Sequence, residues 1–487
     1  MQRGSQMNRF FLQSMIAFSL IIFCHTSCLG LSQPSTDANN SKPRCILVDV
    51  KSKPTDSNWK PFETRTLEQL YDFKPGQKSI KLCEYGGRTD KKFEAKGFFY
   101  PFKIKDRWWL IDPHGHPFVH VAIVGVYTGI TEIGKKTSLE VFGSVEKWAN
   151  FSTKLISDYG FNGTGGWSEA QYLRKSDKPL VYTLSWDFMG QFGTSKNLTY
   201  QDPGHLAYPN KCILVFHPDF EKFCDEYGKK LAETKGDPWL IGHFSDNELP
   251  IPSDLLDRSF GLDVNNPDLK YGYEAAKQWL EKRKGRKADL NDITDADRKD
   301  FIEYVYDRYY RITTSAIRKY DPNHLCIGAR FNGKALECPE VFRAAGKYLD
   351  VISVNYYRAW TPDQKLMMMW YNESGGKPFM ITEWYVKGAD SGLANNSGAG
   401  GVVKTQIDRG RFYHNFVLGL MESKVCVGWH WFKYRDNDPN DTATDPSNRD
   451  SNKGIVDYKY NPYYPLLDEM KKLNENVYQL IDYFDSK

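Results

Sequence analysis

Residues 239–248 of this 487-residue chain read WLIGHFSDNE, an apolar run that ends in a cluster of polar residues. The apolar part is typical of a strand buried on both faces, and Asn247 and Glu248 follow at its carboxyl end. Residues 377–384 read KPFMITEW and repeat the pattern, with Glu383 closing the apolar run. Polar groups at the end of a buried strand are costly unless they have partners or a task. Both strand ends are therefore candidate site positions.

Similar apolar runs alternate with helical stretches from about residue 105 onward. We expect strands at 119–124, 161–164, 180–185, 240–244, 326–329, 351–354, 379–382 and 428–431, and helices at 146–159, 218–234, 297–320, 362–374 and 405–423. Eight strands with helices between them predict an α/β fold of parallel βαβ units, a (β/α)8 TIM barrel. A doubly wound open sheet is the competing fold. It is disfavoured because no strand ends in a Gly-x-Gly-x-x-Gly turn, which Gly163–Thr164–Gly165–Gly166 imitates only loosely.

Two segments depart from plain alternation of strand and helix. Residues 108–118 predict a hairpin, because Pro and Gly punctuate a turn between two apolar runs. Residues 250–300 are longer than a strand–helix connection needs and predict an insertion after the fourth strand. Loops on that side of a barrel build the substrate cleft. The basic stretch 282–287 is interpreted as a solvated helix face.

The first 30 residues predict an export signal. Arg3 and Arg9 precede the apolar run 15–23, which is too short for a membrane span. Cys28 is a candidate for lipidation, as in a bacterial lipoprotein, and simple cleavage nearby is the alternative. No later stretch approaches the roughly 18 apolar residues of a transmembrane helix. We expect a protein without a membrane span that is secreted, periplasmic or held at the cell surface.

Composition and pattern together predict four segments. These are a signal peptide or lipoprotein signal at 1–30, a flexible tether at 31–43, a small N-terminal β segment at 44–100 and the barrel at 101–487. Within the β segment, strands are expected at 45–50, 79–83 and 98–104.

Charge and cysteine content argue against several classes of site. Lys and Arg total 65 against 61 for Asp and Glu, so no nucleic-acid partner is expected. The cysteines form no Cys-x-x-Cys pair, which disfavours a zinc site, and Cys326 and Cys426 are expected to be buried thiols. The Asp-rich tract 436–450 offers oxygen ligands for Ca²⁺ but lacks EF-hand spacing, and a loop that solvates itself is the alternative. We expect no metal and no cofactor, and the sequence does not specify the oligomeric state.

Two carboxylates at opposing strand ends suit the cleavage of a glycosidic bond. One must be protonated to donate to the leaving oxygen, and the other must be ionised to attack the anomeric carbon. A separation of about 5–5.5 Å would give retention through a covalent intermediate. Either glutamate alone is as well explained by an ion pair with a neighbouring Arg or Lys. Finding both, Glu248 after the fourth strand and Glu383 at the seventh, favours catalysis.

Eight further residues near the strand ends are candidate substrate-binding residues. They are Asn162, Asn247, Arg330, Asn355, Tyr357, Trp384, Trp429 and Trp431, with Trp167 and Asn332 close to two of them. An amide beside the first glutamate can bind a sugar hydroxyl, and Tyr357 can donate to the nucleophile. Trp429 and Trp431 alternate with His430, so one face of this strand is expected to present an indole as a stacking floor for a sugar. For the aromatic residues, core packing is the alternative.

Four stretches resemble the exo-β-agarase family within the large clan of retaining (β/α)8 glycosidases. They read RWWLIDPHGH at 107–116, DNE at 246–248, GWHWFKYRDND at 428–438 and SNKGIVD at 451–457. The resemblance spans about residues 96–475. It implies that Glu248 is the acid/base, that Glu383 is the nucleophile and that the substrate is a β-linked galactan. Agarases of that family usually carry a large β-sandwich-like domain ahead of the barrel, and here only residues 44–100 precede it, which weakens the inference about substrate.

Three alternatives to this function stay open. The first is another retaining activity of the same clan, of the β-galactosidase, mannanase or xylanase type. The second is a non-catalytic carbohydrate-binding surface lipoprotein. The third is a metal-dependent hydrolase on the same fold, which is disfavoured because no His-x-His follows the first strand, although His114 and His116 lie in the turn before it.

Overall fold

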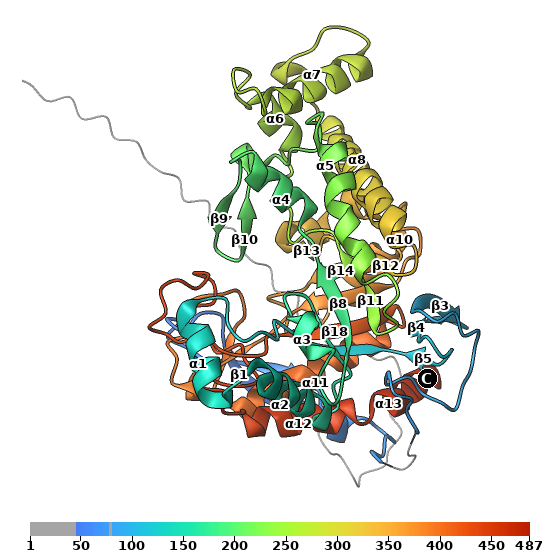
Figure 1. Ribbon diagram of the computed structural model, residues 1–487, viewed down its shortest axis with the longest axis vertical. Coiled ribbons are helices and arrows are strands. Elements are labelled where there is room, and N and C mark those ends of the chain that lie inside the picture. The colour runs from blue at the N-terminus through green and yellow to red at the C-terminus, as the bar shows by residue number, and fades with distance from the viewer. Residues whose placement is uncertain (1–44, 77–79) are drawn as a thin grey trace, which may run out of the picture. The chain divides into compact units, whose positions relative to one another are not determined.

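A nine-stranded parallel sheet forms the centre of the computed structural model, which describes residues 45–76 and 80–487 (Figure 1). In pairing order its strands are β12 (Leu325–Gly328), β11 (Leu240–Phe244), β8 (Val181–Ser185), β7 (Gly163–Thr164), β6 (His120–Val124), β18 (Cys426–Phe432), β15 (Phe379–Glu383), β14 (Ile352–Asn355) and β13 (Phe331–Asn332). The sheet is curled like a half-barrel, as in a TIM-like domain. Each of the eight expected strands coincides with one of these, and the α/β class is confirmed.

The fifth expected strand, 326–329, corresponds to β12, and a second short strand, β13, follows it and was not expected. β12 pairs with β11 and β13 pairs with β14, so the two ends of the sheet order are separated along the chain by only Ala329 and Arg330. The φ angles of Gly328 (+84°) and Arg330 (+53°) lie in the left-handed region, which interrupts regular pairing. As a result, the main-chain N–H of Arg330 donates to the hydroxyl of Ser353 in β14 at 3.0 Å.

Helices lie between successive strands, and the five expected ones correspond to α2, α5, α8, α10 and α11. The helices are α1 (Glu132–Phe142), α2 (Val145–Asp158), α3 (Ala170–Leu173), α4 (Phe188–Ser195), α5 (Phe220–Gly228), α6 (Leu255–Phe260), α7 (Lys270–Lys284), α8 (Asp295–Tyr320), α9 (Pro339–Gly346), α10 (Gln364–Glu373), α11 (Gln406–Glu422), α12 (Tyr464–Asn474) and α13 (Val477–Asp485). Short 3₁₀ turns add Leu67–Gln69, Pro209–Lys211, Lys229–Glu233, Leu290–Asp292, Gly333–Glu337 and Ala389–Ser391. Side-chain caps set where they begin: Thr294 and Asp297 form a reciprocal capping box at the start of α8.

The predicted insertion at 250–300 is confirmed between β11 and α8. It contains α6 and α7, which lie together at the top of the view, beside the first turns of α8 (Figure 1). No helix in the described part of the chain has both the length and the apolar character needed to cross a bilayer.

Two glycines of the run at 163–166 make room for a pair of histidines. A Cβ on Gly163 would lie 1.9 Å from Nε2 of His120, and one on Gly165 would lie 2.8 Å from Nδ1 of His430. The two imidazoles are fully buried, and Nε2 of His430 lies 2.8 Å from Nδ1 of His120. The glycines are therefore needed for close packing, because no side chain fits there.

The N-terminal segment joins the rest of the fold through two small sheets. β1 (Ile46–Lys51) pairs with β2 (Lys60–Thr64) and with β17 (Val402–Val403), which pairs with β16 (Lys387–Gly388). The expected hairpin is confirmed as β4 (Arg107–Ile111) and β5 (Pro117–Phe118), with β3 (Tyr100–Ile104) beside it. Of the strand expected at 79–83, Leu82 forms an isolated bridge with Arg88, and β2 was not anticipated.

The boundaries between the expected segments stay predictions. The signal at 1–30, with Cys28, and the whole tether at 31–43 fall within residues 1–44, which lie outside the described residues, as do residues 77–79.

The apolar core lies on both faces of the sheet. One cluster joins strand residues such as Val181, Ile241 and Met380 to Leu110 and Phe118 of the hairpin. A larger cluster packs the strands against the surrounding helices. Burial on both faces explains why the strand sequences are almost wholly apolar until their last residues. The expected buried thiols, Cys326 and Cys426, are confirmed as members of the larger cluster.

Candidate active site

Glu248 is placed by the segment that follows β11. Ser245 donates its main-chain N–H to the carbonyl of Gly328 at 2.9 Å, and Glu248 donates to the carbonyl of Ala329 at 3.0 Å. Glu248 itself has a φ of +51°, a conformation that L-residues with a side chain rarely adopt. The end of β12 and the residue after it thus hold the segment that follows β11. A strained backbone conformation, as at Glu248, is typical of functional positions.

The carboxyl group of Glu248 lies among amides. Asn355 donates its Nδ2 to Oε1 at 2.7 Å, and the Asn332 side chain also forms a hydrogen bond to the group. Nδ1 of His205 lies 4.0 Å from Oε2 of Glu248. The side chain of Glu248 is only 7% exposed. Burial, reinforced by the negative charge of Glu383, raises the pKa of Glu248 to about 7, against the lowering effect of the amide donors. This carboxyl group is therefore suited to holding a proton near neutral pH.

Glu383 has the opposite surroundings. Nη2 of Arg330 donates to Oε1 and the hydroxyl of Tyr357 donates to Oε2. The indole Nε1 of Trp167 donates to Oε1 at 3.3 Å. The Arg330 guanidinium is fully buried between the rings of Trp167 and Phe244, with centroid distances of 5.4 and 5.1 Å. Glu383 thus accepts from one buried cation and two neutral donors.

Asn355 connects the two glutamate segments. Its Nδ2 donates to Glu248 and, at 3.3 Å, to Oδ1 of Asn247. Its Oδ1 accepts from the hydroxyl of Thr382, the residue before Glu383, at 2.8 Å. Asn355 is fully buried, so it fixes how the ends of β11, β14 and β15 face one another.

The structure therefore brings together six of the ten predicted site residues. They are Asn247, Glu248, Arg330, Asn355, Tyr357 and Glu383. Trp167, which is 37% exposed, joins them as the exposed aromatic ring of this group.

The structure does not bring Asn162 or the three tryptophans to the carboxylates. The amide of Asn162 donates to the carbonyl of Val119 at 2.8 Å and accepts from the N–H of Val121 at 2.9 Å, so it fastens β7 to the start of β6. Trp384 stacks on Phe416 with a centroid distance of 4.3 Å.

Trp429 and Trp431 do alternate with His430, but the indoles take the helix side of β18. Nε1 of Trp429 donates to the hydroxyl of Tyr413 in α11 at 3.1 Å, and Nε1 of Trp431 donates to the carbonyl of Lys453. His430 occupies the other face. Side chains of this strand therefore alternate between its two faces, as expected. The indoles of Trp429 and Trp431 fill the space between sheet and helix, where they are at most 1% exposed, so they match the core-packing alternative and not a stacking floor for a sugar.

Two elements of the site were missed by the sequence analysis. His205 comes from the hairpin of β9 (Tyr200–Asp202) and β10 (His205–Ala207), and no local pattern marks it. Asp246 accepts from the main-chain N–H groups of Met189 and Gly190, both at 3.0 Å, and from the hydroxyl of Tyr309. Burial and then the charge of Asp187 raise the pKa of Asp246 to about 8. Asp246 thus anchors the Asn247–Glu248 segment to α4.

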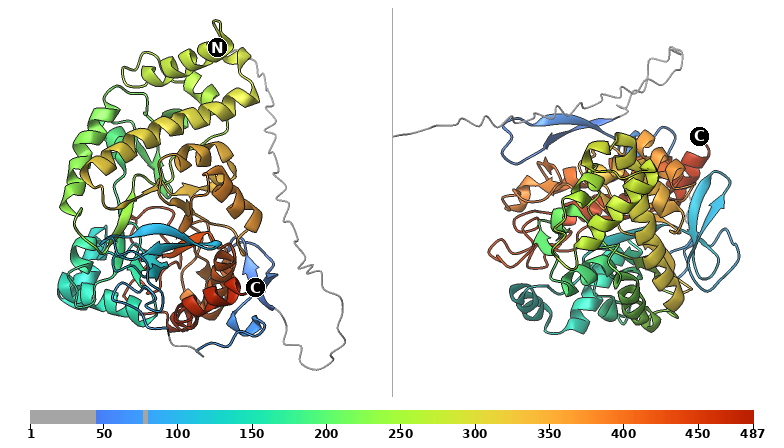
Figure 2. Two further views of the ribbon diagram at one scale, coloured as in Figure 1. Left: turned by 90° about the vertical axis from the view of Figure 1, so that its right-hand side faces the viewer. Right: turned by 90° about the horizontal axis from the view of Figure 1, so that it is seen from above.

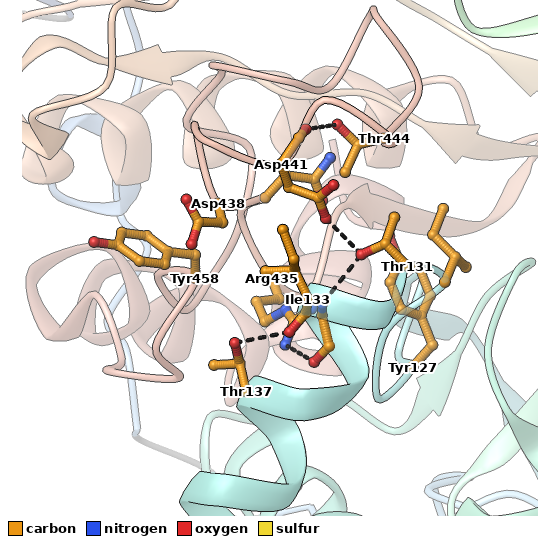
Figure 3. Close-up of a pocket in the computed structure, with 12 residues that line it drawn as sticks. Tyr127, Thr131, Ile133, Thr137, Arg435, Asp438, Asp441, Thr444 and Tyr458 are labelled. Atoms are coloured by element: carbon orange, nitrogen blue, oxygen red, sulfur yellow. Dashed lines mark hydrogen bonds between the residues drawn. The ribbon is translucent and has the colours of Figure 1, made fainter.

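The Asp-rich tract 436–450 is engaged in hydrogen bonds that shape its own loop. Asp441 accepts from the hydroxyl of Thr131 beside a cavity of about 10 Å³ (Figure 3). Asp436 accepts from the main-chain N–H groups of Lys453 and Gly454, both at 2.7 Å. These contacts fit the self-solvated alternative.

Among the described residues, two groups lie close enough to share a metal ion. They are Cys83, Asp112 and His116, and His243, Asp321 and His324. In the second group Oδ2 of Asp321 lies 2.8 Å from Nε2 of His243 and 2.7 Å from Nδ1 of His324. The outer nitrogens are also occupied, by the indole of Trp186 and the carbonyl of Asp237. These contacts make the second group a hydrogen-bonded network, and neither group includes Glu248 or Glu383.

No family model matches the chain. β-Agarase B of Vibrio sp. (strain JT0107) is 25% identical over 554 residues, which cover 92% of this chain and 56% of that protein. The chain spans about half the length of the curated relatives it matches. The crystal structure of BpGH50 is 33% identical, with a TM-score of 0.78 over 91% of this chain and 96% of that one. The structure of an exo-β-agarase has a TM-score of 0.65 over 84% of this chain and 68% of that one at 20% identity, which shows a shared fold.

Proposed function

The chain belongs to the agarase-like GH50 family of glycoside hydrolases, and on that premise we propose that it cleaves β-glycosidic bonds of an agarose-type galactan with retention of configuration. The observation that carries this proposal is the contrast between the two carboxyl groups: Glu248 is buried among amides with a raised pKa, and Glu383 is bound by Arg330 and Tyr357. Two carboxyl groups held in different protonation states are what acid-assisted glycoside cleavage needs.

In the first step, an oxygen of Glu383 attacks the anomeric carbon while the bond to the leaving oxygen breaks. The proton of Glu248 passes to that oxygen, so the aglycone leaves as a neutral alcohol. Arg330 and Tyr357 hold the Glu383 carboxylate in position. As Glu383 loses its charge to the new ester bond, the electrostatic penalty for ionising Glu248 falls.

In the second step, the ionised Glu248 removes a proton from water, which attacks the anomeric carbon of the glycosyl ester. The carbon–oxygen bond to Glu383 breaks and its carboxylate is regenerated. Glu248 ends the cycle protonated and Glu383 ends it ionised, as both began. Asn247, beside Glu248, is placed to bind a sugar hydroxyl next to the reacting carbon.

We further infer that the curled sheet closes as a (β/α)8 barrel. The support is that β12 and β13, the two ends of the pairing order, are consecutive pieces of one chain segment. Closure would place the carboxyl ends of all the strands, with Glu248 and Glu383, around one mouth. The export signal at 1–30 would bring the enzyme to polysaccharide outside the cytoplasm, with Cys28 as the possible lipid anchor.

The test is a substrate panel with product analysis. Purified protein is incubated with agarose, porphyran, carrageenan, xylan, mannan and β-galactan oligosaccharides, and proton NMR follows the anomeric configuration of the first product. Cleavage of agarose-type chains with a β product supports the proposal. Cleavage of another glycan alone would reject the agarose-type substrate. An α first product would reject the double displacement.

A further inference from the structure

A groove of about 400 Å³ lies on the insertion, apart from the two carboxylates. Half of the residues that line it are aromatic, namely Phe216, Tyr271, Trp279 and Tyr304, and Glu274 and Gln278 lie among them. Tyr304 is 41% exposed, and Phe216, Tyr271 and Trp279 are partly exposed. The polar residues Glu274 and Gln278 are exposed, as is Lys282 at the same rim. The mechanism proposed above uses none of these residues.

The aromatic rings of the groove are held in place by neighbouring side chains. Phe216 stacks on Tyr304 with a centroid distance of 5.5 Å and an interplanar angle of 23°. Trp279 meets the edge of Phe301 at 5.2 Å. Tyr271 meets the ring of His217 at 5.1 Å. A ligand that stacks on these rings would therefore lose little affinity to ordering them.

The groove is built from the same connections that supply the carboxylate surroundings. Phe216 lies between β10 and α5, in the connection from β8 to β11 that also carries His205, the neighbour of Glu248. Tyr271 and Trp279 lie on α7, in the insertion at 250–300, and α7 lies near the first part of α8 (Figure 2). The hydroxyl of Tyr306 in α8 donates to the carbonyl of Pro250 at 2.7 Å, which ties α8 to this insertion.

We propose that this groove is a second carbohydrate-binding site, which holds a distant stretch of the galactan chain whose end lies between Glu248 and Glu383. Aromatic faces pack against the apolar C–H faces of sugars, and exposed amide, carboxylate and ammonium groups bind sugar hydroxyls. The inference rests on the proposed function, because it takes the substrate class from there.

A protein partner fits this groove less well. A volume of about 400 Å³ is within the usual range of small-ligand sites, roughly 300–1,000 Å³, whereas a stable protein interface buries about 800 Å² on each side. Glu274 and Lys282 line the groove itself, and charged residues are depleted at the core of protein interfaces. A polysaccharide strand is narrow enough for a groove of this volume, and its hydroxyl groups can bind the charged side chains of Glu274 and Lys282.

The experiment separates the groove from the active site. Binding of agarose is measured by affinity electrophoresis in a Glu383→Gln background, with Trp279→Ala and Tyr304→Ala added singly and together. We expect each substitution to weaken binding roughly tenfold, the scale of one lost aromatic contact. Tyr71→Ala, at a tyrosine that is 78% exposed and outside the groove, is the matched control and should bind normally. Trp279→Tyr keeps a ring and guards against misfolding, and it should bind more tightly than Trp279→Ala.

Activity gives the second measurement, with Glu383 intact. The groove variants should lose activity on the polymer and keep wild-type kcat/KM on a short oligosaccharide, which does not reach the groove. Unchanged binding in the double variant would overturn the inference, as would a wild-type dimer in light scattering that the groove substitutions dissociate. If no galactan is cleaved but agarose is still retained through Trp279 and Tyr304, the proposed function fails and this inference stands.

Discussion

Glu248 and Glu383 are the same amino acid at the ends of two parallel strands, and their surroundings differ in almost every respect. Glu248 accepts from neutral amides and lies 4.0 Å from an imidazole. Glu383 accepts from a guanidinium, a phenol and an indole. Both are nearly buried, so burial alone does not separate them.

Two carboxyl groups at nearly equal depth therefore differ in their partners, and under the mechanism proposed above those partners assign the roles of acid and nucleophile. Burial disfavours the ionised form of any carboxyl group. Glu383 accepts from the guanidinium of Arg330, which is itself buried and within hydrogen-bond distance. At Glu248, burial and the negative charge of Glu383 outweigh the amide donors and the charge of Arg330, so its pKa is raised.

The largest effect is expected from removing the nucleophile. Glu383→Gln should lower kcat on agarose-type oligosaccharides by at least about a thousandfold, because an amide cannot form the glycosyl ester. Glu94→Gln, at a side chain that is 75% exposed, is the matched control and should keep full activity. In Glu248→Ala, azide should restore turnover of an aryl β-galactoside and give a β-glycosyl azide, because the phenolate leaves without a proton and azide attacks the ester without a general base. A β-glycosyl azide from Glu383→Ala, and none from Glu248→Ala, would exchange the two roles.

The next effect concerns the phenol that donates to Glu383. Tyr357→Phe should reduce kcat about tenfold to a hundredfold, the scale of one hydrogen bond to a charged group. Tyr356→Phe is the matched control, because the neighbouring hydroxyl accepts from the N–H of Asp363 instead. Equal losses in both variants would mean that Tyr357 acts only through packing.

The dependence of kcat/KM on pH should report the raised pKa of Glu248. The acid must be protonated in the free enzyme, so activity should fall as pH rises through about 7. Replacing Glu383 with Gln removes the negative charge that raises this pKa, so the pKa should fall. Titration of the Glu248 carboxyl by carbon NMR in wild type and Glu383→Gln measures that change. An unchanged or higher pKa in the variant would contradict the coupling.

The same raised pKa predicts a stability cost that depends on pH. The folded protein binds a proton at Glu248 up to about pH 7, and the unfolded chain releases it near 4.5, so the group destabilises the fold increasingly as pH rises across that interval. Glu248→Gln should therefore stabilise the protein by about 1–3 kcal/mol at pH 8 and by little at pH 4. Denaturant unfolding at both pH values measures this. Equal effects at both would show that charge is not the cause.

The smallest effect on activity is expected at the tryptophans of β18. Trp429→Phe loses the hydrogen bond to Tyr413 and part of the packing under α11, so Tm should fall. Because the indole is 1% exposed, kcat/KM should stay within about twofold of wild type. A large rise in KM with an unchanged Tm would instead indicate that Trp429 stacks on a sugar of the substrate.

Local sequence patterns predict much of this fold. Short apolar runs such as 240–244 and 379–383 suit strands of a sheet buried on both faces, and the polar residues that end them mark the carboxyl edge. Their length and their alternation with helical stretches predicted these strands within a few residues, and their ends made Glu248 and Glu383 candidates without coordinates. The insertion at 250–300 was equally plain, because it exceeds the length that a single crossover helix requires.

Tertiary structure decided which face each side chain takes and which groups meet. The alternation of Trp429, His430 and Trp431 leaves two possible orientations, and packing against α11 selected the one that buries both indoles. Arg330 reaches Glu383 only because the strand break at Ala329 turns it across the sheet, and His205 approaches Glu248 from a distant hairpin. A pKa depends on burial and charge in three dimensions, so the different surroundings of Glu248 and Glu383, on which their proposed roles rest, follow from contacts that are distant in the chain.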